Sequence, residues 1–202
     1  MDESSHDASF AAIVLAAGAS SRLGQPKQLL KSDGETLLAR TARLASQAGA
    51  SPVLVILGFE SARMEQALAN LAVMVAVNTD WPTGMASTLR LGMQILLERR
   101  PVPESVLLLV CDQVRLDGTL LDQLRQVHAR GNVPVTAARY SGRLGVPAIF
   151  RRELFEDLLA LKGDQGARRI LDVHAGNAGV VEFPGGELDI DTPQDLDMLR
   201  RR

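Results

Sequence analysis

Short runs of aliphatic and β-branched residues recur along the chain, and several are continuously apolar instead of alternating with polar residues. Continuous apolar runs of this length are typical of strands that are covered on both faces, as in a parallel sheet. The runs that predict strands are 12–16, 53–57, 73–77, 106–110, 133–139, 146–150 and 180–183.

Between these runs lie stretches whose apolar residues recur every three or four positions, as on one face of a helix. The clearest spans residues 36–49, with Gly49 where a helix C-cap belongs. Further stripes predict helices near residues 64–71, 120–127 and 154–159, and a helix that continues through Leu89 and Met93. A last helix is predicted to begin at Thr192, with Pro193 at its first position and the acid Asp195 at its third.

Strands that alternate with helices in this way predict βαβ units and a mostly parallel sheet. We expect one α/β domain over residues 10–202, preceded by a loose polar tail over residues 1–9. Sheets of this type bind ligands in the crevice beyond the carboxyl ends of their strands. The residues that directly follow each strand are therefore the candidates for a functional site.

Composition excludes several classes of function. The chain has 202 residues, with 22 basic and 24 acidic side chains and a net charge of −2, so no global basic field exists to gather nucleic acid. A single cysteine, Cys111, leaves no intramolecular disulfide. The acidic N-terminus does not resemble a signal peptide, and the longest apolar run, 10–19, is too short for a membrane span. We expect a soluble cytoplasmic protein.

His128 and His174 fall late in helical segments, where a cation suits the helix dipole.

The segment after the first predicted strand has the ingredients of a phosphate-binding loop. It contains neither a G-x-G-x-x-G fingerprint nor a Walker motif. Small residues from Ala16 to Ser21 nevertheless let the backbone approach a ligand closely and point N–H groups at an anion. Arg22 offers a planar fork for phosphate oxygens, and Lys27 offers a point charge. The alternative is an ordinary turn that carries two solvated cations.

Two carboxylates stand at the ends of predicted strands. Asp112 follows the run 106–110, and Asp191, or alternatively Asp189, ends the last strand before the capped helix. Such positions suit a hard cation, because Mg²⁺ prefers one or two carboxylates together with phosphate oxygens. Asp112 could instead cap a turn, and Asp191 could simply complement a helix N-terminus.

A family resemblance joins these features. Residues 15–24, followed by Pro26 and Lys27, resemble the signature L-A-[AG]-G-x-S-x-R-[ML]-G-x-x-K of molybdopterin nucleotidyltransferases of the MobA-like NTP transferase family. Five further segments resemble the cytidylyltransferase branch of that family in the expected order, over about residues 10–200: 78–89, 111–113, 145–150, 163–168 and 189–193. The resemblance implies a Rossmann-like three-layer fold of the nucleotide-diphospho-sugar transferase type.

The resemblance also implies a reaction and its residues. Members transfer a nucleotide to the phosphate of molybdopterin or its molybdenum-bearing form and release pyrophosphate. Arg22, Lys27 and Asp112 would be catalytic, and Asp112 and Asp191 would share a Mg²⁺ ion. The residues implied to bind the nucleotide are Leu15, Ala16, Ala17, Gly18, Ala19, Ser20, Ser21, Arg22, Lys27, Asn78, Gly84 and Ser87.

The identity of the base and the residues that meet the acceptor are implied by finer details of the same resemblance. The alanine of L-A-A-G, Ala17, favours CTP over GTP. The acceptor is implied to meet Gly145, Asp164, Gly166 and Arg168. Several of these residues have simpler alternatives: a polar strand end for Asn78, a helix cap for Ser87 and a solvated side chain for Arg168. For Trp81 we favour packing in the core beneath its loop.

The chain departs from the family where Val114 and Arg115 replace the proline that usually follows Asp-Gln. This departure leaves the role of Gln113 open and allows an altered acceptor.

Three functions remain open on the sequence. The first is a cytidylyltransferase for a molybdopterin-type acceptor, in transient contact with a molybdenum hydroxylase or its chaperone. The second is a guanylyltransferase, or a transferase of the same fold that acts on a sugar or polyol phosphate. The third is a non-catalytic carrier of molybdenum cofactor, against which the intact Arg22, Lys27 and Asp112 argue.

Overall fold

The computed structural model describes residues 10–196 and contains a central sheet of seven strands. The predicted tail over residues 1–9 and the continuation of the last helix beyond residue 196 lie outside the described residues. The strand order is β5-β4-β1-β6-β8-β7-β9. The strands are β1 (Phe10–Ala16), β4 (Val53–Leu57), β5 (Met74–Val77), β6 (Ser105–Val110), β7 (Val135–Tyr140), β8 (Arg143–Arg151) and β9 (Ala178–Glu182).

The sheet is mostly parallel, as predicted. Strand β8 is antiparallel to both of its neighbours, whereas the other pairings in the sheet are parallel. The reversal follows from the connection between β7 and β8, which is only the turn at Ser141 and Gly142, both with positive φ. A turn of two residues with positive φ at both positions joins antiparallel strands, and it leaves no room for a crossover helix.

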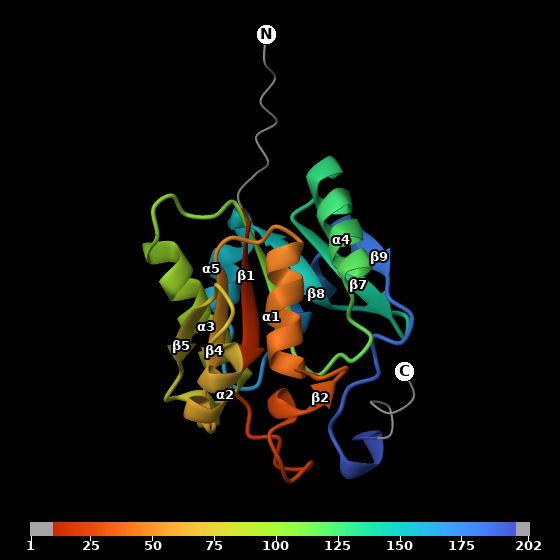
Figure 1. Cartoon of the computed structure of the whole chain (residues 1–202). Helices are drawn as coiled ribbons and strands as arrows, with labels where there is room; N and C mark the ends of the chain where they lie inside the picture. The colour runs from red at the N-terminus through yellow and green to blue at the C-terminus, as the bar shows by residue number, and fades with distance from the viewer. Residues whose placement is uncertain (1–9, 197–202) are drawn as a thin grey trace.

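Helices cover both faces of the sheet and complete the three predicted layers. One face carries α1 (Leu37–Gln47), α2 (Ser61–Leu68) and α4 (Gly118–Arg130), and the other carries α3 (Met85–Glu98), α5 (Phe155–Leu159) and α6 (Arg168–Val173). Figure 1 shows α1 and α4 in front of the strands. Alternate residues of β1 feed the two cores: Ala12 and Val14 pack toward α1, and Ala11 and Ile13 pack toward α3.

Local signals end α1 as the sequence predicts. Gly49 adopts a φ of +89° and donates its N–H to the Ser46 carbonyl, while the Ala50 N–H bonds to the Ala45 carbonyl. These are the two bonds of a Schellman motif, which requires a residue with positive φ at this position. A small hairpin of β2 (Lys31–Ser32) and β3 (Glu35–Thr36) precedes the helix.

The carboxyl ends of β1, β4, β5 and β6 lie along one edge, because these strands are parallel and adjacent. The loops that follow β1 and β6 begin at Ala17 and Cys111 and therefore meet at this edge. Within residues 10–196, no helix is long and apolar enough to cross a membrane.

His128, near the end of α4, is not the helix-end cation that the sequence predicts. Its side chain is buried, with Nε2 2.9 Å from Ser105 Oγ and Nδ1 3.2 Å from Thr136 Oγ1. Burial, together with the nearby charge of Arg151, lowers the pKa of His128 to about 4. The imidazole is therefore neutral at pH 7 and does not serve the helix dipole as a cation.

This histidine predicts a pH-dependent stability. Because its pKa falls from 6.5 in the unfolded chain to about 4 in the folded protein, the unfolded state binds more protons between these values. The neutral His128 therefore contributes up to about 3 kcal/mol to the free energy of unfolding. This contribution is fully present above pH 6.5 and is lost as the pH falls toward 4. Urea unfolding at about pH 7 and about pH 4.5 should show this loss. His128→Gln should show a smaller loss, and equal losses in both proteins would contradict the assignment.

Candidate active site

The loop after β1 is held in shape by a buried glutamine. Gln28, which is 1% exposed, donates its Nε2 to the carbonyls of Ala16 and Gly18 at 3.2 and 2.7 Å. The Ser20 hydroxyl donates to Gln28 Oε1 at 3.4 Å and accepts the N–H of Lys27 at 3.2 Å. Gln28 thus fixes the start of the loop and Ser20 closes it. Gln28 was not among the residues selected from the sequence, although an amide directly before Leu29 and Leu30 is a signal that could have found it.

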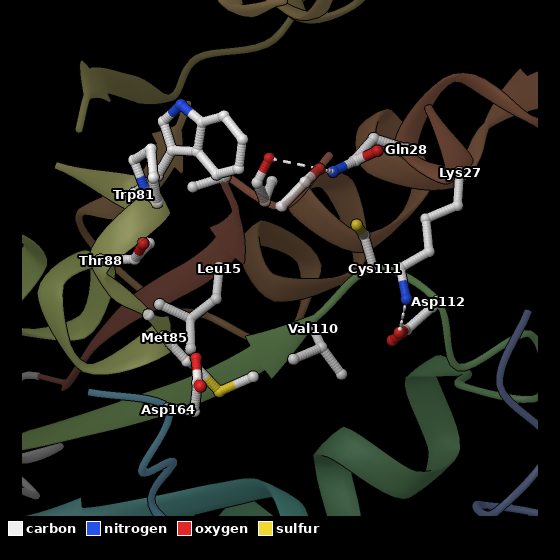
Figure 2. Close-up of a pocket in the computed structure, with 15 residues that line it drawn as sticks. Leu15, Lys27, Gln28, Trp81, Met85, Thr88, Val110, Cys111, Asp112 and Asp164 are labelled. Atoms are coloured by element: carbon white, nitrogen blue, oxygen red, sulfur yellow. Dashed lines mark hydrogen bonds and ion pairs between the residues drawn. The ribbon is translucent and has the colours of Figure 1, made fainter. Parts of the chain in front are cut away.

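Lys27 brings together both carboxylates that the sequence analysis selected. Its Nζ lies 2.5 Å from Asp112 Oδ2 and 2.8 Å from Asp191 Oδ1 (the first contact is drawn in Figure 2). Arg22 contacts the other oxygen of Asp191 at 2.8 Å, but its side chain is 74% exposed. Arg22, Lys27, Asp112 and Asp191 therefore form one charged group at the carboxyl edge of the sheet.

The turn that carries Asp191 is fixed from behind by Asp195. Its Oδ2 accepts the N–H groups of Asp191 and Thr192 at 3.1 and 2.8 Å, and it also accepts the Thr192 hydroxyl. The predicted helix start is thus present, with a 3-10 turn over Pro193–Leu196. An acid at the third position that reaches back to the cap is the reciprocal half of a capping box.

The electrostatics of the group keep Lys27 and Asp191 ionised. Burial alone would lower the pKa of Lys27, but the charge of Asp112 and hydrogen bonds to Asp112 and Asp191 outweigh it and raise that pKa. The hydrogen bond from Lys27 holds the pKa of Asp191 below its usual value. Asp189 behaves differently, because burial and the charge of Asp112 raise its pKa to about 7. Asp191, and not Asp189, shares the ammonium group of Lys27 with Asp112.

The donor set fits a hard divalent cation. Asp112 Oδ1 is buried and has no hydrogen-bond partner among the described residues, and Asp112 and Asp191 converge on one point, Lys27 Nζ. Residues 10–196 contain no group of three or more His, Cys, Asp or Glu side chains able to hold a metal. Two carboxylates that leave further positions to phosphate oxygens and water match the preference of Mg²⁺.

A first cavity of about 390 Å³ extends from this charged group along the loop after β1. Figure 2 shows Lys27 and Asp112 on one side of it and Trp81 and Thr88 on the other. Its lining residues come from the ends of β1 and β6, from the segment after β1, from the turn before α3 and the start of that helix, and from the loop that carries Asp164. They are Leu15, Ala16, Ala17, Gly18, Lys27, Gln28, Trp81, Pro82, Gly84, Met85, Thr88, Val110, Cys111, Asp112 and Asp164.

A second cavity of about 290 Å³ adjoins the first. All four residues predicted to meet the acceptor line it, namely Gly145, Asp164, Gly166 and Arg168. Tyr140 and Asp189, which the sequence analysis did not place there, line it as well. The two cavities share five lining residues: Leu15, Met85, Val110, Asp112 and Asp164. Asp112 therefore stands where ligands of the two cavities would meet.

The structure does not place Asn78 and Ser87 where they were predicted to bind the nucleotide, because neither residue lines the first cavity. Asn78 Nδ2 donates to Ser87 Oγ and Thr88 Oγ1 at 2.9 and 3.0 Å, and its Oδ1 accepts the Asp80 N–H. The Ser87 hydroxyl bonds to the carbonyls of Asp80 and Gly84. Both side chains are buried and fasten the loop after β5 to α3, so a direct contact with the nucleotide is not what their geometry offers.

Of the other residues predicted to bind the nucleotide, some line the first cavity and some lie outside its lining. Ala19, Ser20, Ser21 and Arg22 are not among the residues that line the first cavity. Trp81 differs from the favoured expectation, since its ring lines the cavity and packs edge-to-face on Phe59 with centroids 5.8 Å apart.

Val114, one of the two residues at the departure from the family pattern, is buried. It packs with Leu23, Leu37 and Ile190 in a small apolar cluster. This cluster lies between the loop after β1, the start of α1 and the segment that carries Asp189 and Asp191. Val114 therefore supports the segments on either side of the charged group by packing.

Gly84 joins the loops of the two cavities. It has a φ of +111°, and a Cβ at this position would lie 2.3 Å from the carbonyl carbon of Gly163. The Gly163 carbonyl accepts the N–H of Ala86, which satisfies one of the unpaired donors at the start of α3. Only glycine allows this close approach, and it ties the loop that carries Asp164 to the mouth of the first cavity.

Comparison with known proteins finds a matching family and relatives that cover nearly the whole chain. Residues 12–178 match the MobA-like NTP transferase domain. The purine catabolism protein PucB of Bacillus subtilis is 30% identical over 199 residues, covering 94% of this chain and 95% of PucB. A Synechococcus elongatus protein named a probable molybdenum cofactor guanylyltransferase is 57% identical over 37 residues, or 18% of this chain and 19% of its own.

A solved structure has the same fold over nearly its whole length. The crystal structure of Rv0371c from Mycobacterium tuberculosis superposes with a TM-score of 0.81 at 30% identity, covering 95% of this chain and 96% of that chain. A second structure of Rv0371c, in complex with manganese, gives a TM-score of 0.77 at 27% identity, covering 95% of this chain and 97% of that chain.

The matched domain and the related proteins identify the chain as a nucleotidyltransferase, an enzyme that moves a nucleotide from a triphosphate to an acceptor. Within this class the chain belongs to the MobA-like NTP transferase family.

Gln28 generates a prediction about the loop. Gln28→Ala leaves the carbonyls of Ala16 and Gly18 without their donor, so we expect a loss of about 2 kcal/mol in unfolding free energy and weaker binding of nucleoside triphosphate. Urea unfolding and titration calorimetry measure the two effects. Gln47→Ala is the matched control, because Gln47 is exposed and its amide oxygen accepts a hydrogen bond from Arg43 on the same helix. Indistinguishable behaviour of the two variants would contradict the role of Gln28.

Proposed function

We propose that the protein transfers CMP from CTP to the phosphate of molybdopterin, or of its molybdenum-bearing form, with release of pyrophosphate and dependence on Mg²⁺. The observation that carries this proposal is the position of Lys27, Asp112 and Asp191. These residues stand at the end of a cavity suited to a nucleotide, and Asp112 is shared with a second cavity suited to an acceptor.

The first cavity would hold the donor nucleotide. Its phosphates would lie along the backbone from Gly18 onward, where a loop after a parallel strand can present N–H groups to an anion. Lys27 would contact the α-phosphate. Arg22, exposed at the rim, would close on the outer phosphates together with the loop residues up to Ser21.

The reaction requires no covalent intermediate on the protein. An oxygen of the acceptor phosphate forms a bond to the α-phosphorus, the bond from that phosphorus to the β-bridging oxygen breaks, and pyrophosphate leaves with the electron pair. Lys27 would stabilise the charge that develops on the α-phosphate, and such transfers depend mainly on positioning and charge neutralisation. Cys111 is no nucleophile, because burial and the charge of Asp112 raise the pKa of its thiol to about 12.

Asp112 and Asp191 would hold the Mg²⁺ ion, which when bound would supply positive charge to the phosphates of both substrates. The buried, unpartnered Oδ1 of Asp112 supports this assignment. The related Rv0371c has been crystallised with manganese, another divalent cation with a preference for oxygen ligands.

The choice of CTP rests on Ala17. Ala17 is 5% exposed and lines the first cavity, and its methyl group would take up space that a glycine would leave to a larger base. The similarity to a protein named a guanylyltransferase makes GTP the competing donor. A difference of one methyl group is worth only about 1–3 kcal/mol, so some use of GTP is expected.

The second cavity would hold the acceptor, with Arg168 placed to meet its phosphate or its ring system. The product would then pass to a molybdenum hydroxylase or its chaperone. Two alternatives have distinct outcomes: a transferase for a sugar or polyol phosphate would release pyrophosphate with that acceptor instead, and a pure carrier would release none.

The donor preference can be measured directly. Purified protein with Mg²⁺ and molybdopterin should release pyrophosphate faster with CTP than with GTP, and only slowly with ATP. A coupled pyrophosphate assay provides the rates, and reactions without acceptor provide the baseline. A preference for GTP would overturn the cytidylyl assignment, and release with sugar phosphates alone would overturn the acceptor.

Lys27 can be tested beside a matched lysine. Lys27→Ala should lower kcat by about 10²–10³-fold, because it removes a positioned cation from the reacting phosphate. Lys31→Ala should leave kcat unchanged, since Lys31 is exposed on β2. A Lys27→Ala protein that keeps more than about a tenth of the wild-type rate would rule out the role given to Lys27.

A further inference from the structure

Thr88 lies in the first turn of α3 and faces the first cavity. It is 4% exposed, yet it is one of the residues that line that cavity. Figure 2 shows it beside Trp81, on the far side of the cavity from Lys27 and Asp112. A hydroxyl buried to this extent is costly unless its hydrogen-bonding groups find partners.

The hydrogen bonds around Thr88 leave its proton unused. Asn78 Nδ2 donates to Thr88 Oγ1 at 3.0 Å, so the hydroxyl oxygen is already an acceptor. The Gly84 carbonyl, one turn back in the helix, accepts both the N–H and the hydroxyl of Ser87. Within residues 10–196 the structure gives the Thr88 hydroxyl no acceptor of its own. A hydroxyl has one donor, and here that donor remains for a ligand.

Asn78 cannot reverse this arrangement. Its Oδ1 accepts the Asp80 N–H at 3.0 Å, which orients the amide so that both Nδ2 hydrogens point at Ser87 and Thr88. Ser87 in turn donates to backbone carbonyls. In this chain of bonds the Thr88 oxygen accepts a hydrogen from Asn78. The Thr88 O–H therefore points away from the Asn78 amide.

We infer that Thr88 donates a hydrogen bond to the base of the bound nucleotide and helps to select cytosine, and that Asn78 is the positioning residue that sets the direction of this bond. The inference rests on the proposed function for the identity of the nucleotide. It also gives Asn78 a part in base choice without a contact to the base.

The geometry favours the base over the other parts of the nucleotide. With phosphates near Gly18 and Lys27, the base reaches the opposite side of the cavity, where Trp81 and Thr88 lie. Cytosine presents two adjacent acceptors there, N3 and O2. Guanine presents two adjacent donors, N1–H and N2–H, on the corresponding edge. A fixed donor therefore pairs with cytosine and opposes that edge of guanine, and unpaired polar groups in such a site discriminate strongly.

Titration calorimetry with Mg²⁺ and no acceptor tests the inference without catalysis. Thr88→Val keeps the shape of the side chain and removes the hydroxyl, so the Kd for CTP should rise about tenfold while the Kd for GTP stays unchanged or falls. Thr88→Ser restores the donor and should bind CTP like the wild type. Asn78→Asp should behave like Thr88→Val, because a carboxylate accepts from both neighbouring hydroxyls and draws the Thr88 proton away from the base.

Base analogues locate the acceptor. The wild type should bind 3-deaza-CTP or 2-thio-CTP more weakly than CTP, and Thr88→Val should lose that difference for one of them. Equal affinities of wild type and Thr88→Val for CTP, or equal weakening for CTP and GTP, would overturn the role of Thr88 and leave the proposed function standing. A wild-type protein that binds GTP but not CTP would overturn both. Thermal melts of each variant verify that it is folded.

Discussion

The ammonium group of Lys27 lies between two carboxylates from distant parts of the sequence, and this ion-paired group organises the carboxyl edge of the sheet. It joins the loop after β1 to the end of β6 and to the segment before the last helical turn. Lys27 and Asp112 are largely withdrawn from solvent, with side chains 20% and 15% exposed. A buried charge is tolerable only when it is paired, so these segments depend on one another for their positions.

The supporting contacts explain how a short chain holds this group in place. Gln28 shapes the loop before Lys27, Asp195 shapes the turn that carries Asp191, and Val114 fills the space between them. The two cavities then open on either side of Asp112, and the close approach of Gly84 and Gly163 links their loops. A site that must align two phosphorylated substrates benefits from such rigidity, because small displacements of reacting groups are costly.

Much of this arrangement follows from local sequence. The sequence indicated the seven strands and helices α1 to α5, and residues after the strands indicated Lys27, Asp112 and Asp191, since parallel strands end at one edge. The direction of β8 was not predicted because it depends on the two-residue turn at its start. The roles of individual site residues were harder to predict. Side-chain chemistry alone does not say whether the Asn78 amide binds a ligand or binds Thr88, since that depends on which hydrogen bonds the packed loop completes.

A crystal structure of the protein with CTP and Mn²⁺ would locate both the metal and the nucleotide, because the anomalous scattering of manganese marks the metal and the density marks each phosphate. We expect manganese bound by Asp112 and Asp191, the α-phosphate against Lys27, and cytosine beside Trp81 and Thr88. Triphosphate density in the second cavity, or a metal held away from both carboxylates, would contradict it.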